Sequence, residues 1–262
     1  MSDPFGGDES ARKSDFVARV VNHALHDLVI RCTKTEEVRD YYHVSVIGYG
    51  GGGPGPALAG ALSGRAVVPI SEVADNPARV ESGFRRVGDG AGGFVEMPVR
   101  YPVWVYAHAD GGTPMCHALR RVKDVLRQWL AEHPRGFPPT VLHLTDGESS
   151  DGDPGEAGRE IMSMTTDDGQ ALLFNCHVSS SRSSKVEYPA GADVLPDGFA
   201  RTLFGISSTL PENFRAAAQQ LGVRVVESSR GFVFNADPSS VVQFYEIGTS
   251  LTGMSPHIWM DA

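Results

Sequence analysis

Apolar residues recur every three or four positions in two long stretches of the chain, and this spacing predicts two amphipathic helices. Elsewhere, short runs rich in β-branched, aromatic or leucine residues predict strands, because such side chains suit a half-buried pleated surface. The expected elements are helices at 13–32, 115–132, 156–164, 211–221 and 238–249, and strands at 41–49, 66–70, 140–146 and 171–178.

The segments between these elements set the expected domain organisation. Residues 1–10 are rich in Gly, Asp and Ser and are expected to form a flexible lead. We expect one α/β domain over 11–250, with an irregular insertion at 179–210, followed by a C-terminal tail at 251–262. Residues 71–100 contain many Gly and Arg positions without clean periodicity, which indicates surface helix and loop.

Composition and charge narrow the class of protein. The chain has 262 residues, 41% of them hydrophobic, which is ordinary for a soluble globular protein. A net charge of −9 argues against nucleic acid as the main partner, since phosphate binding needs clustered Lys and Arg. Cys32, Cys116 and Cys176 are far apart and odd in number, so they form neither a zinc motif nor a disulfide framework. No apolar run approaches the length needed to span a membrane, so we expect no membrane contact. The unpaired cysteines suit a reducing compartment, so we expect a cytoplasmic protein.

Two short stretches contain the candidate chemistry. In Asp110-Gly-Gly-Thr-Pro-Met115, a glycine turn opens a helix, with Thr113 expected as the N-cap and Pro114 at the first helical position. In Thr140-Val-Leu-His-Leu-Thr-Asp-Gly-Glu148, Asp146 falls where a buried strand ends. Groups at the carboxyl ends of strands in an open α/β sheet converge on one crevice. A hydroxyl and a carboxylate at one rim are hard oxygen donors, which suit Mg²⁺ or Mn²⁺.

These two stretches together resemble the von Willebrand factor A (vWA) domain family, in its bacterial cytoplasmic type. The resemblance implies a three-layer α/β/α fold with a mostly parallel, Rossmann-like sheet. In that family the two stretches are the second and third pieces of a metal-ion-dependent adhesion site. The first piece, Asp-x-Ser-x-Ser at the end of the central first strand, does not occur before the helix at 13–32. We therefore expect this strand to be missing, lying upstream of Met1, and the strands at 42–49 and 141–146 to flank an empty or substituted position.

The resemblance also implies a function. Mg²⁺ (or Mn²⁺) at the strand tips leaves one coordination position open, and an Asp or Glu of a partner protein completes it. Thr113 would coordinate directly or through water, and Asp146 would mostly hold a metal-bound water. We expect weak metal binding by this chain, because the first ligand motif is absent. Bacterial relatives of this kind are often encoded with kinases or phosphatases of signalling and stress systems, which suggests that setting for the partner.

Two alternatives remain open. The first is a metal-free structural scaffold whose site is inactive. The second, which the sequence favours least, is a nucleotide-binding enzyme, because Gly48, Gly50 and Gly53 match G-x-G-x-x-G after a strand and Glu72 follows at a distance suited to a ribose contact. That motif needs a helix directly after the glycines, and prolines at 54 and 56 interrupt it. No catalytic signature of another kind is present, and we expect no enzymatic activity.

Overall fold

A computed structural model describes residues 4–5, 8–88, 93–109, 111–179 and 184–250. The chain divides into two compact units, whereas the sequence predicts one domain over 11–250. Unit 1 contains Met1–Phe16, Tyr49–Pro54 and Ala109–Ala262, and unit 2 contains Val17–Gly48 and Gly55–His108. Within the described residues, no helix combines the length and apolar character needed to cross a membrane.

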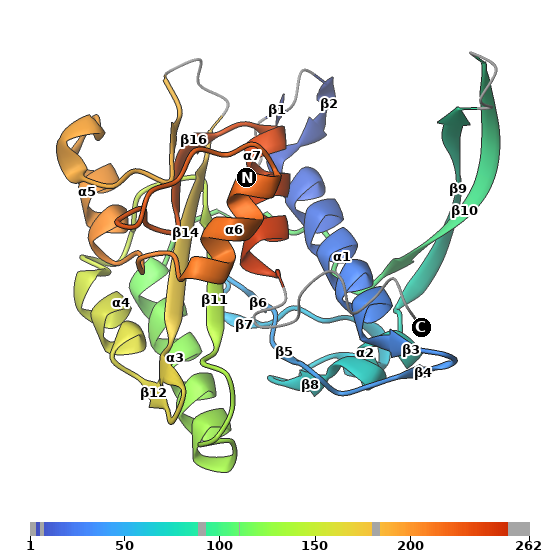
Figure 1. Cartoon of the computed structure of the whole chain (residues 1–262), viewed down its shortest axis with the longest axis horizontal. Helices are drawn as coiled ribbons and strands as arrows, with labels where there is room; N and C mark the ends of the chain where they lie inside the picture. The colour runs from blue at the N-terminus through green and yellow to red at the C-terminus, as the bar shows by residue number, and fades with distance from the viewer. Residues whose placement is uncertain (1–3, 6–7, 89–92, 110, 180–183, 251–262) are drawn as a thin grey trace. The chain divides into compact units, whose positions relative to one another are not determined.

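Unit 1 is built on a mixed four-stranded sheet in the order β11-β14-β16-β15 (Figure 1). The strands β11 (Thr140–Thr145), β14 (Leu172–Val178) and β16 (Phe232–Ala236) are parallel, and β15 (Val186–Glu187) pairs antiparallel with β16. Strand β14 lies in the middle, and most of its side chains on both faces are buried. A nearly continuous apolar run is what a parallel strand covered on both faces requires.

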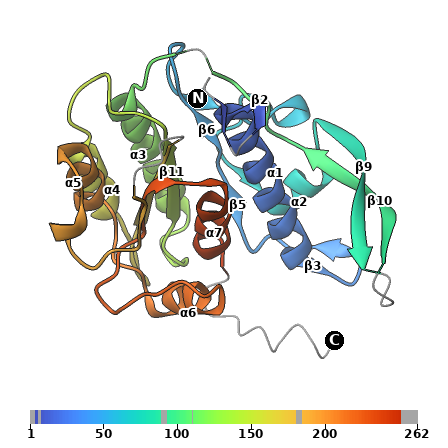
Figure 2. The same cartoon turned by 90° about the horizontal axis from the view of Figure 1, so that it is seen from above.

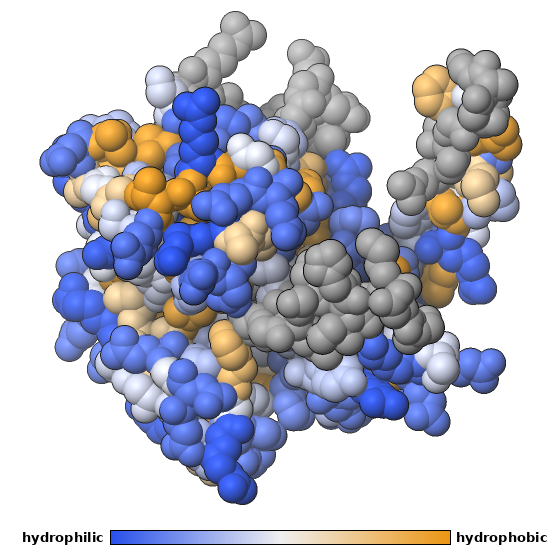
Figure 3. Space-filling view, viewed as in Figure 1, coloured by the Kyte–Doolittle hydropathy of each residue, from blue (hydrophilic) through white to orange (hydrophobic). Residues whose placement is uncertain are grey.

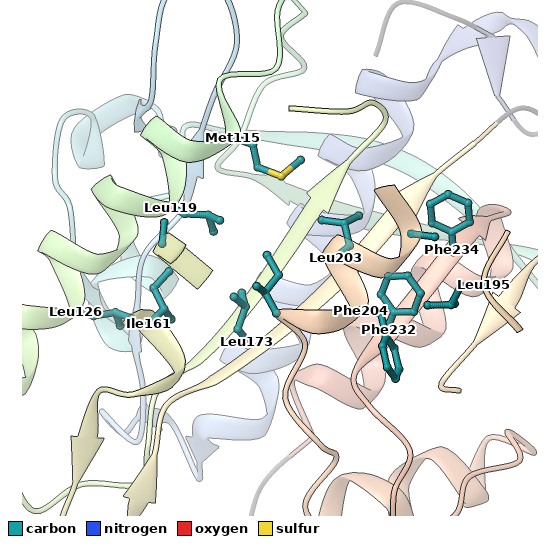
Figure 4. Close-up of a cluster of buried hydrophobic side chains, with 13 residues drawn as sticks. Met115, Leu119, Leu126, Ile161, Leu173, Leu195, Leu203, Phe204, Phe232 and Phe234 are labelled. Atoms are coloured by element: carbon teal, nitrogen blue, oxygen red, sulfur yellow. The ribbon is translucent and has the colours of Figure 1, made fainter. Parts of the chain in front are cut away.

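Helices lie on both faces of this sheet (Figure 2). On one face are α3 (Met115–Glu132), α4 (Gly155–Met162) and α5 (Gly198–Gly205), and on the other is α7 (Pro238–Gly248). Alternate residues of β14 serve the two faces, because successive strand side chains point in opposite directions. Leu173 joins the cluster formed with α3 and α4, drawn in Figure 4, whereas Phe174 meets the ring of Phe214 edge-on at 5.3 Å.

The other elements of unit 1 are short and surround the sheet. They include β1 and β2, which pair antiparallel within the lead that the sequence predicts to be flexible. The insertion predicted to be irregular contains β15 and α5. The remaining bounds are β1 Pro4–Phe5, β2 Asp8–Arg12, β12 Thr165–Thr166, β13 Gly169–Gln170, the 3-10 helix η2 Ala192–Val194 and α6 Glu212–Gln220.

Unit 2 packs one face of α1 (Lys13–Cys32, whose first turn belongs to unit 1) onto small hairpins and a short helix. Its core is apolar, and Trp104 at its centre is 1% exposed. The Trp104 ring nitrogen donates to the carbonyl of Val73 at 2.6 Å. The elements are β3 Thr33–Lys34, β4 Glu37–Val38, β5 His43–Val44, β6 Ile47–Gly48, β7 Gly55–Pro56, η1 Gly60–Leu62, β8 Val68–Pro69, α2 Ile70–Asp75, β9 Arg79–Gly88 and β10 Phe94–Val103.

Two expectations for unit 2 are wrong. The predicted strand 41–49 is divided into β5 and β6, which pair with β8 and β7 in separate sheets. The partner strands are only two residues long and each ends in proline, whose missing N–H stops a ladder. Residues 71–100, predicted as surface helix and loop, contain the helix α2 but also most of the long β9–β10 hairpin, which contradicts the rest of that prediction.

The expected arrangement around a central strand is also wrong. The strands of 42–49 were expected to flank one position together with 141–146, but β5 and β6 belong to different sheets from β11. Within the described residues, β11 is an edge strand of its sheet and pairs only with β14. The structure therefore shows an α/β protein with a mixed sheet.

Candidate functional site

The carboxyl end of β11 turns sharply at Asp146. The hydroxyl of Thr145, which is buried, donates to the carbonyl of Gly147 at 2.7 Å and accepts from the Gly147 N–H at 3.3 Å. This side chain therefore closes the turn on its own backbone, as serine and threonine often do. The turn holds Asp146 half-buried at the carboxyl edge of the parallel strands, the edge at which ligands bind in open α/β sheets.

The Thr113 turn lies beside this strand end. Gly111 and Gly112 have φ values of 78° and 71°, a left-handed conformation that glycine adopts without strain. Beyond them, the Thr113 hydroxyl oxygen lies 3.5 Å from where a Cβ on Gly147 would stand. The structure thus brings Thr113 next to the residue that follows Asp146, while Asp110 lies outside the described residues.

The start of α3 differs from the sequence expectation. The helix begins at Met115 with Pro114 as the N-cap, so Thr113 stands one residue before the cap and its hydroxyl does not cap the helix. The Thr113 backbone instead joins the loop after β11. Its N–H donates to the hydroxyl of Ser150 at 3.0 Å, and its carbonyl accepts from the Ser150 N–H at 2.9 Å.

Asp151 performs the capping that Thr113 does not. One carboxylate oxygen accepts from the Cys116 N–H and the other from the His117 N–H, both at 2.9 Å. The Ser149 hydroxyl also donates to this carboxylate at 2.9 Å. Partial burial alone would raise the pKa of Asp151, but these hydrogen bonds outweigh it and lower the pKa below the usual value. A negative charge at a helix N-terminus is stabilised as well by the helix dipole.

A third loop, the glycine run 50–53, adjoins the same turn. Gly51 lies 3.7 Å from where a Cβ on Gly112 would stand, and Gly53 (φ 85°) lies near the His117 ring. The Gly53 N–H donates to the carbonyl of Gly50 at 2.9 Å, which closes a turn. The positive φ values at 53 and 112 favour glycine there, whereas a Cβ at either position would meet only ordinary contacts.

The glycine run does not lead into a helix. In the described chain the first helical residues after Gly53 are those of the 3-10 helix η1, at 60–62. A dinucleotide site needs the N-terminus of an α-helix directly after its glycines, where the free N–H groups hold the pyrophosphate. Glu72, the expected ribose contact, is paired with Arg65. The nucleotide-binding alternative therefore lacks its main structural requirement.

A buried polar network lies directly beneath the rim. The His143 ring accepts or donates at both nitrogens, with Nε2 2.8 Å from the Tyr49 hydroxyl and Nδ1 2.7 Å from the Asn175 side-chain oxygen. The Asn175 side-chain nitrogen faces Ile206 carbonyl oxygen at 3.1 Å and Ser207 hydroxyl oxygen at 2.9 Å. The amide orientation is therefore set by these acceptors, and the Asn175 oxygen must accept from a protonated Nδ1 of His143.

The network is neutral. Burial lowers the pKa of His143 and raises the pKa of Tyr49, so a single proton on His143 and an intact Tyr49 hydroxyl are favoured. With Nδ1 protonated, Nε2 is an acceptor, so the single Tyr49 hydroxyl proton is shared between Nε2 at 2.8 Å and the carbonyl of Leu144, to which the hydroxyl donates at 2.9 Å. His143 and Asn175 are buried and Tyr49 is half-buried, and their hydrogen bonds hold the strands beneath the rim.

Cys176 and His177 do not act together, as their adjacent positions on a strand predict. Cys176 is fully buried, and burial raises the pKa of its thiol, so it is not a reactive nucleophile. His177 stacks on Phe234 with 4.4 Å between ring centroids. Burial and the nearby charge of Lys13 lower the pKa of His177 to about 4.

The donor set suits a hard cation in kind but is short in number. Thr113 offers a hydroxyl and Asp146 a carboxylate, which are the oxygen ligands that Mg²⁺ and Mn²⁺ prefer. Across the described residues, no group of three or more His, Cys, Asp or Glu side chains is placed to hold one ion. A cation at this rim would therefore depend on water or on a partner for most of its coordination.

Sequence reasoning found Thr113 and Asp146 but missed two residues that organise the rim. Asp151 is part of an acidic, glycine-rich run whose composition predicts a solvated loop. The one indication of its role in the sequence is its position shortly after the end of a predicted strand. Tyr49 ends the run predicted as a strand, and nothing in the local pattern indicates that its hydroxyl reaches a histidine far along the chain.

Comparison of the chain with protein-family models, with curated proteins and with solved structures finds no match in any of the three. No family is therefore shown, and function must be inferred from the side chains and their geometry. The most informative geometry is the junction of the Thr113 turn with the turn after Asp146.

Proposed function

We propose that this chain is a protein-binding module of the vWA type. Thr113 and Asp146 would provide oxygen donors to Mg²⁺ (or Mn²⁺), and an Asp or Glu of a partner protein would complete the coordination. The observation that carries this proposal is the position of the Thr113 hydroxyl, 3.5 Å from where a Cβ on Gly147 would stand, beside the strand end that bears Asp146. This position supports a site in which two sequence-distant residues contribute oxygen donors at the carboxyl edge of a parallel sheet.

The surrounding loops support this function by limiting motion at the rim. The Thr113 backbone makes two hydrogen bonds with Ser150, one to its hydroxyl and one from its N–H, and Asp151 anchors the same loop to the first turn of α3. Donors held in place need less ordering when a ligand arrives, which improves affinity for a given number of contacts. The rim is therefore partly organised before a cation or partner binds.

The chemistry predicts weak binding of a cation by the chain alone. Mg²⁺ requires nearly octahedral oxygen coordination and releases its water reluctantly. Asp146 supplies one negative charge, so a bound cation would keep most of its positive charge and would attract a carboxylate of the partner. The parallel strands β11, β14 and β16 with helices on both faces are consistent with the three-layer vWA arrangement, which remains part of the proposal.

A metal-free scaffold is the alternative. It is favoured by the lack, among the described residues, of three acidic, histidine or cysteine side chains placed around one point. In that case the site at the rim would be inactive, and the chain would have a structural role. The proposed setting, a bacterial signalling or stress system in the cytoplasm, applies to both alternatives.

Titration with Mn²⁺ distinguishes these functions, because free Mn²⁺ can be measured by its electron paramagnetic resonance signal. We expect binding weaker than about 0.1 mM, lost in both Thr113→Ala and Asp146→Ala. Glu148→Ala is the matched control, since it removes an exposed carboxylate two residues away and should leave binding unchanged. No binding by the natural chain would favour the metal-free scaffold, and binding that survives Asp146→Ala would place the ion elsewhere.

A further inference from the structure

The β9–β10 hairpin, called here the arm, is a long ribbon in unit 2. Its strands are 10 residues each, and they pair antiparallel without a bulge from Phe94 opposite Gly88 to Val103 opposite Arg79. In the described chain neither strand pairs with any other strand. A two-stranded ribbon without further cover is only marginally stable in water, so its formation suggests an additional partner.

The arm exposes large apolar side chains on both faces. Opposite residues of an antiparallel pair point to the same face, so the Phe84–Pro98 and Phe94–Gly88 pairs share one face, and Val95 and Met97 belong to the other. Phe84 and Phe94 are 71% and 75% exposed, and Val95 and Met97 are 53% and 51% exposed. Hydrophobic residues are visible on the arm at the upper right of Figure 3. Contiguous exposed apolar surface of this kind marks an interaction site.

The two edges of the arm are not equivalent. Strand β10 contains Pro98 and Pro102, and proline is found in sheets mainly where its missing N–H faces away from the ladder. The outer edge of β10 therefore lacks two donors and resists the addition of a strand. Strand β9 contains no proline, so its outer edge keeps a full set of N–H donors and carbonyl acceptors.

We propose that β9 pairs antiparallel with β9 of a second copy of this chain, giving a four-stranded sheet in the order β10-β9-β9-β10. Closed twofold pairing of one patch with itself is the commonest way in which identical chains associate. The pairing satisfies the free edge of β9 and unites the apolar faces of two arms. It goes beyond the proposed function and does not depend on the rim at Asp146.

One pair of charges in β9 is placed for pairing with a second copy, although Glu81 also forms an ion pair with Arg79 of its own strand. Glu81 and Arg85 are placed symmetrically about Gly83. Antiparallel pairing with Gly83 opposite its equivalent would put Glu81 opposite Arg85 of the second copy, twice in each dimer. Opposite charges directly across a strand pair are favourable and like charges are not. In the same register Phe84 stands opposite Ser82 of the other copy, and the two Phe84 rings are diagonal neighbours within reach of each other.

The charge of the chain argues against nucleic acid as the partner of the arm. Residues 79–103 contain four arginines and three acidic residues, a net charge of 4 − 3 = +1. The whole chain has a net charge of −9, so the rest contributes −9 − 1 = −10. An arm of such small net charge offers little attraction for phosphate groups, and the acidic remainder of the chain repels nucleic acid.

Sedimentation velocity of the full chain over a range of concentrations tests this dimer. We expect the natural chain to dimerise reversibly, and Glu81→Arg and Arg85→Glu each to weaken dimerisation about tenfold or more by placing like charges opposite each other. The double variant Glu81→Arg/Arg85→Glu restores the opposite-charge pairs and should dimerise like the natural chain. Arg100→Glu on β10 is the control for a change of charge outside the paired strand.

The results that overturn the proposal are distinct. A natural chain that stays monomeric at every concentration refutes it, and so does a dimer that neither single substitution weakens. Failure of the double variant to recover dimerisation also refutes it, provided that circular dichroism shows a folded chain. Recovery by the double variant cannot arise from general damage to the fold, because that variant contains both substitutions.

Discussion

Replacing Asp151 with alanine tests whether a residue outside α3 organises the rim. The change removes a carboxylate that accepts three hydrogen bonds. The donors are the N–H groups of Cys116 and His117 and the Ser149 hydroxyl. The first amides of α3 would then have no side-chain acceptor, because the helix has no capping side chain of its own. The loop would also lose its attachment to the helix.

The expected magnitude follows from two contributions. Loss of a capping side chain costs about 0.5–2 kcal/mol, and loss of a negative charge at a helix N-terminus costs about 0.3–1 kcal/mol. Asp151 is exposed, so water replaces part of what is lost, and we expect Asp151→Ala to lower the free energy of unfolding by about 2 kcal/mol. Asp151→Asn keeps one acceptor without the charge and should cost about 1 kcal/mol.

The pH dependence gives a second signature of the same contact. Because the pKa of Asp151 is lowered in the folded protein, its contribution is present above the unfolded pKa of about 3.9 and is lost as the pH falls through the folded value. The difference in stability between the natural chain and Asp151→Ala should therefore be largest near neutral pH and should shrink below about pH 4.

Hydrogen exchange together with urea denaturation measures this effect locally and globally. The amides of Cys116 and His117 should lose protection in Asp151→Ala and keep it in Glu148→Ala, which removes a nearby exposed carboxylate. Unchanged protection at these two amides in Asp151→Ala would refute the reasoning. So would a loss of stability that is the same at acidic and neutral pH.

Two further predictions concern the core of unit 1. The pKa of His177 is lowered to about 4, so its folded form resists protonation and stability should fall by about 2–3 kcal/mol as the pH drops from 7 to 4. Denaturation curves measured across this pH range should show that His177→Gln loses this pH dependence of stability, whereas His117→Gln, at an exposed histidine, keeps it. A Cβ on Gly231 would stand 2.1 Å from the Phe174 ring, so Gly231→Ala should cost about 1–3 kcal/mol in thermal unfolding. Gly198→Ala, where nothing lies within 4 Å, should cost far less, and equal losses would show that the contact with Phe174 is not the cause.

The long elements could be predicted because each one has a local cause. Helices at 13–32 and 115–132 have the bounds that their periodicity predicts, and the strands at 140–145 and 172–178 fall within the predicted apolar runs. In these segments the side chains that face the core are already spaced for their secondary structure. The pairing partners of a strand, in contrast, lie elsewhere in the sequence, which is why 41–49 could be read as extended but not as two separate strands.

The arm was missed because it does not alternate between apolar and polar residues. Its apolar side chains appear on both faces, and its strands contain glycine, arginine and proline, which weaken any single-sequence indication of a strand. A ribbon with two exposed faces has no buried side to impose a period of two. The signal that was available is the pair of opposite charges, Glu81 and Arg85, at equal distances from Gly83.

The candidate site could be predicted only in part. Thr113 and Asp146 were identified from their positions at a turn and a strand end, and their role as metal ligands remains a prediction. The N-cap role assigned to Thr113 is wrong, because Asp151 caps the helix from 35 residues away and leaves the Thr113 hydroxyl outside the cap. Long-range hydrogen bonds of this kind depend on how loops meet and leave no trace in local spacing.

The pairing of His143 with Asn175 determines how β11 aligns with β14. Both strands are mainly apolar, so sliding β11 by two residues would keep every side chain on its own face. Such a slip would separate the imidazole from the amide and leave His143 Nδ1 and the Asn175 side-chain oxygen unpaired in the interior, at about 1–3 kcal/mol for each atom. The pair therefore fixes the register of two strands that hydrophobicity alone would allow to pair in several registers. Because His143 is three residues before Asp146, the register fixed inside the sheet determines how far the Asp146 carboxylate projects past the edge of the sheet.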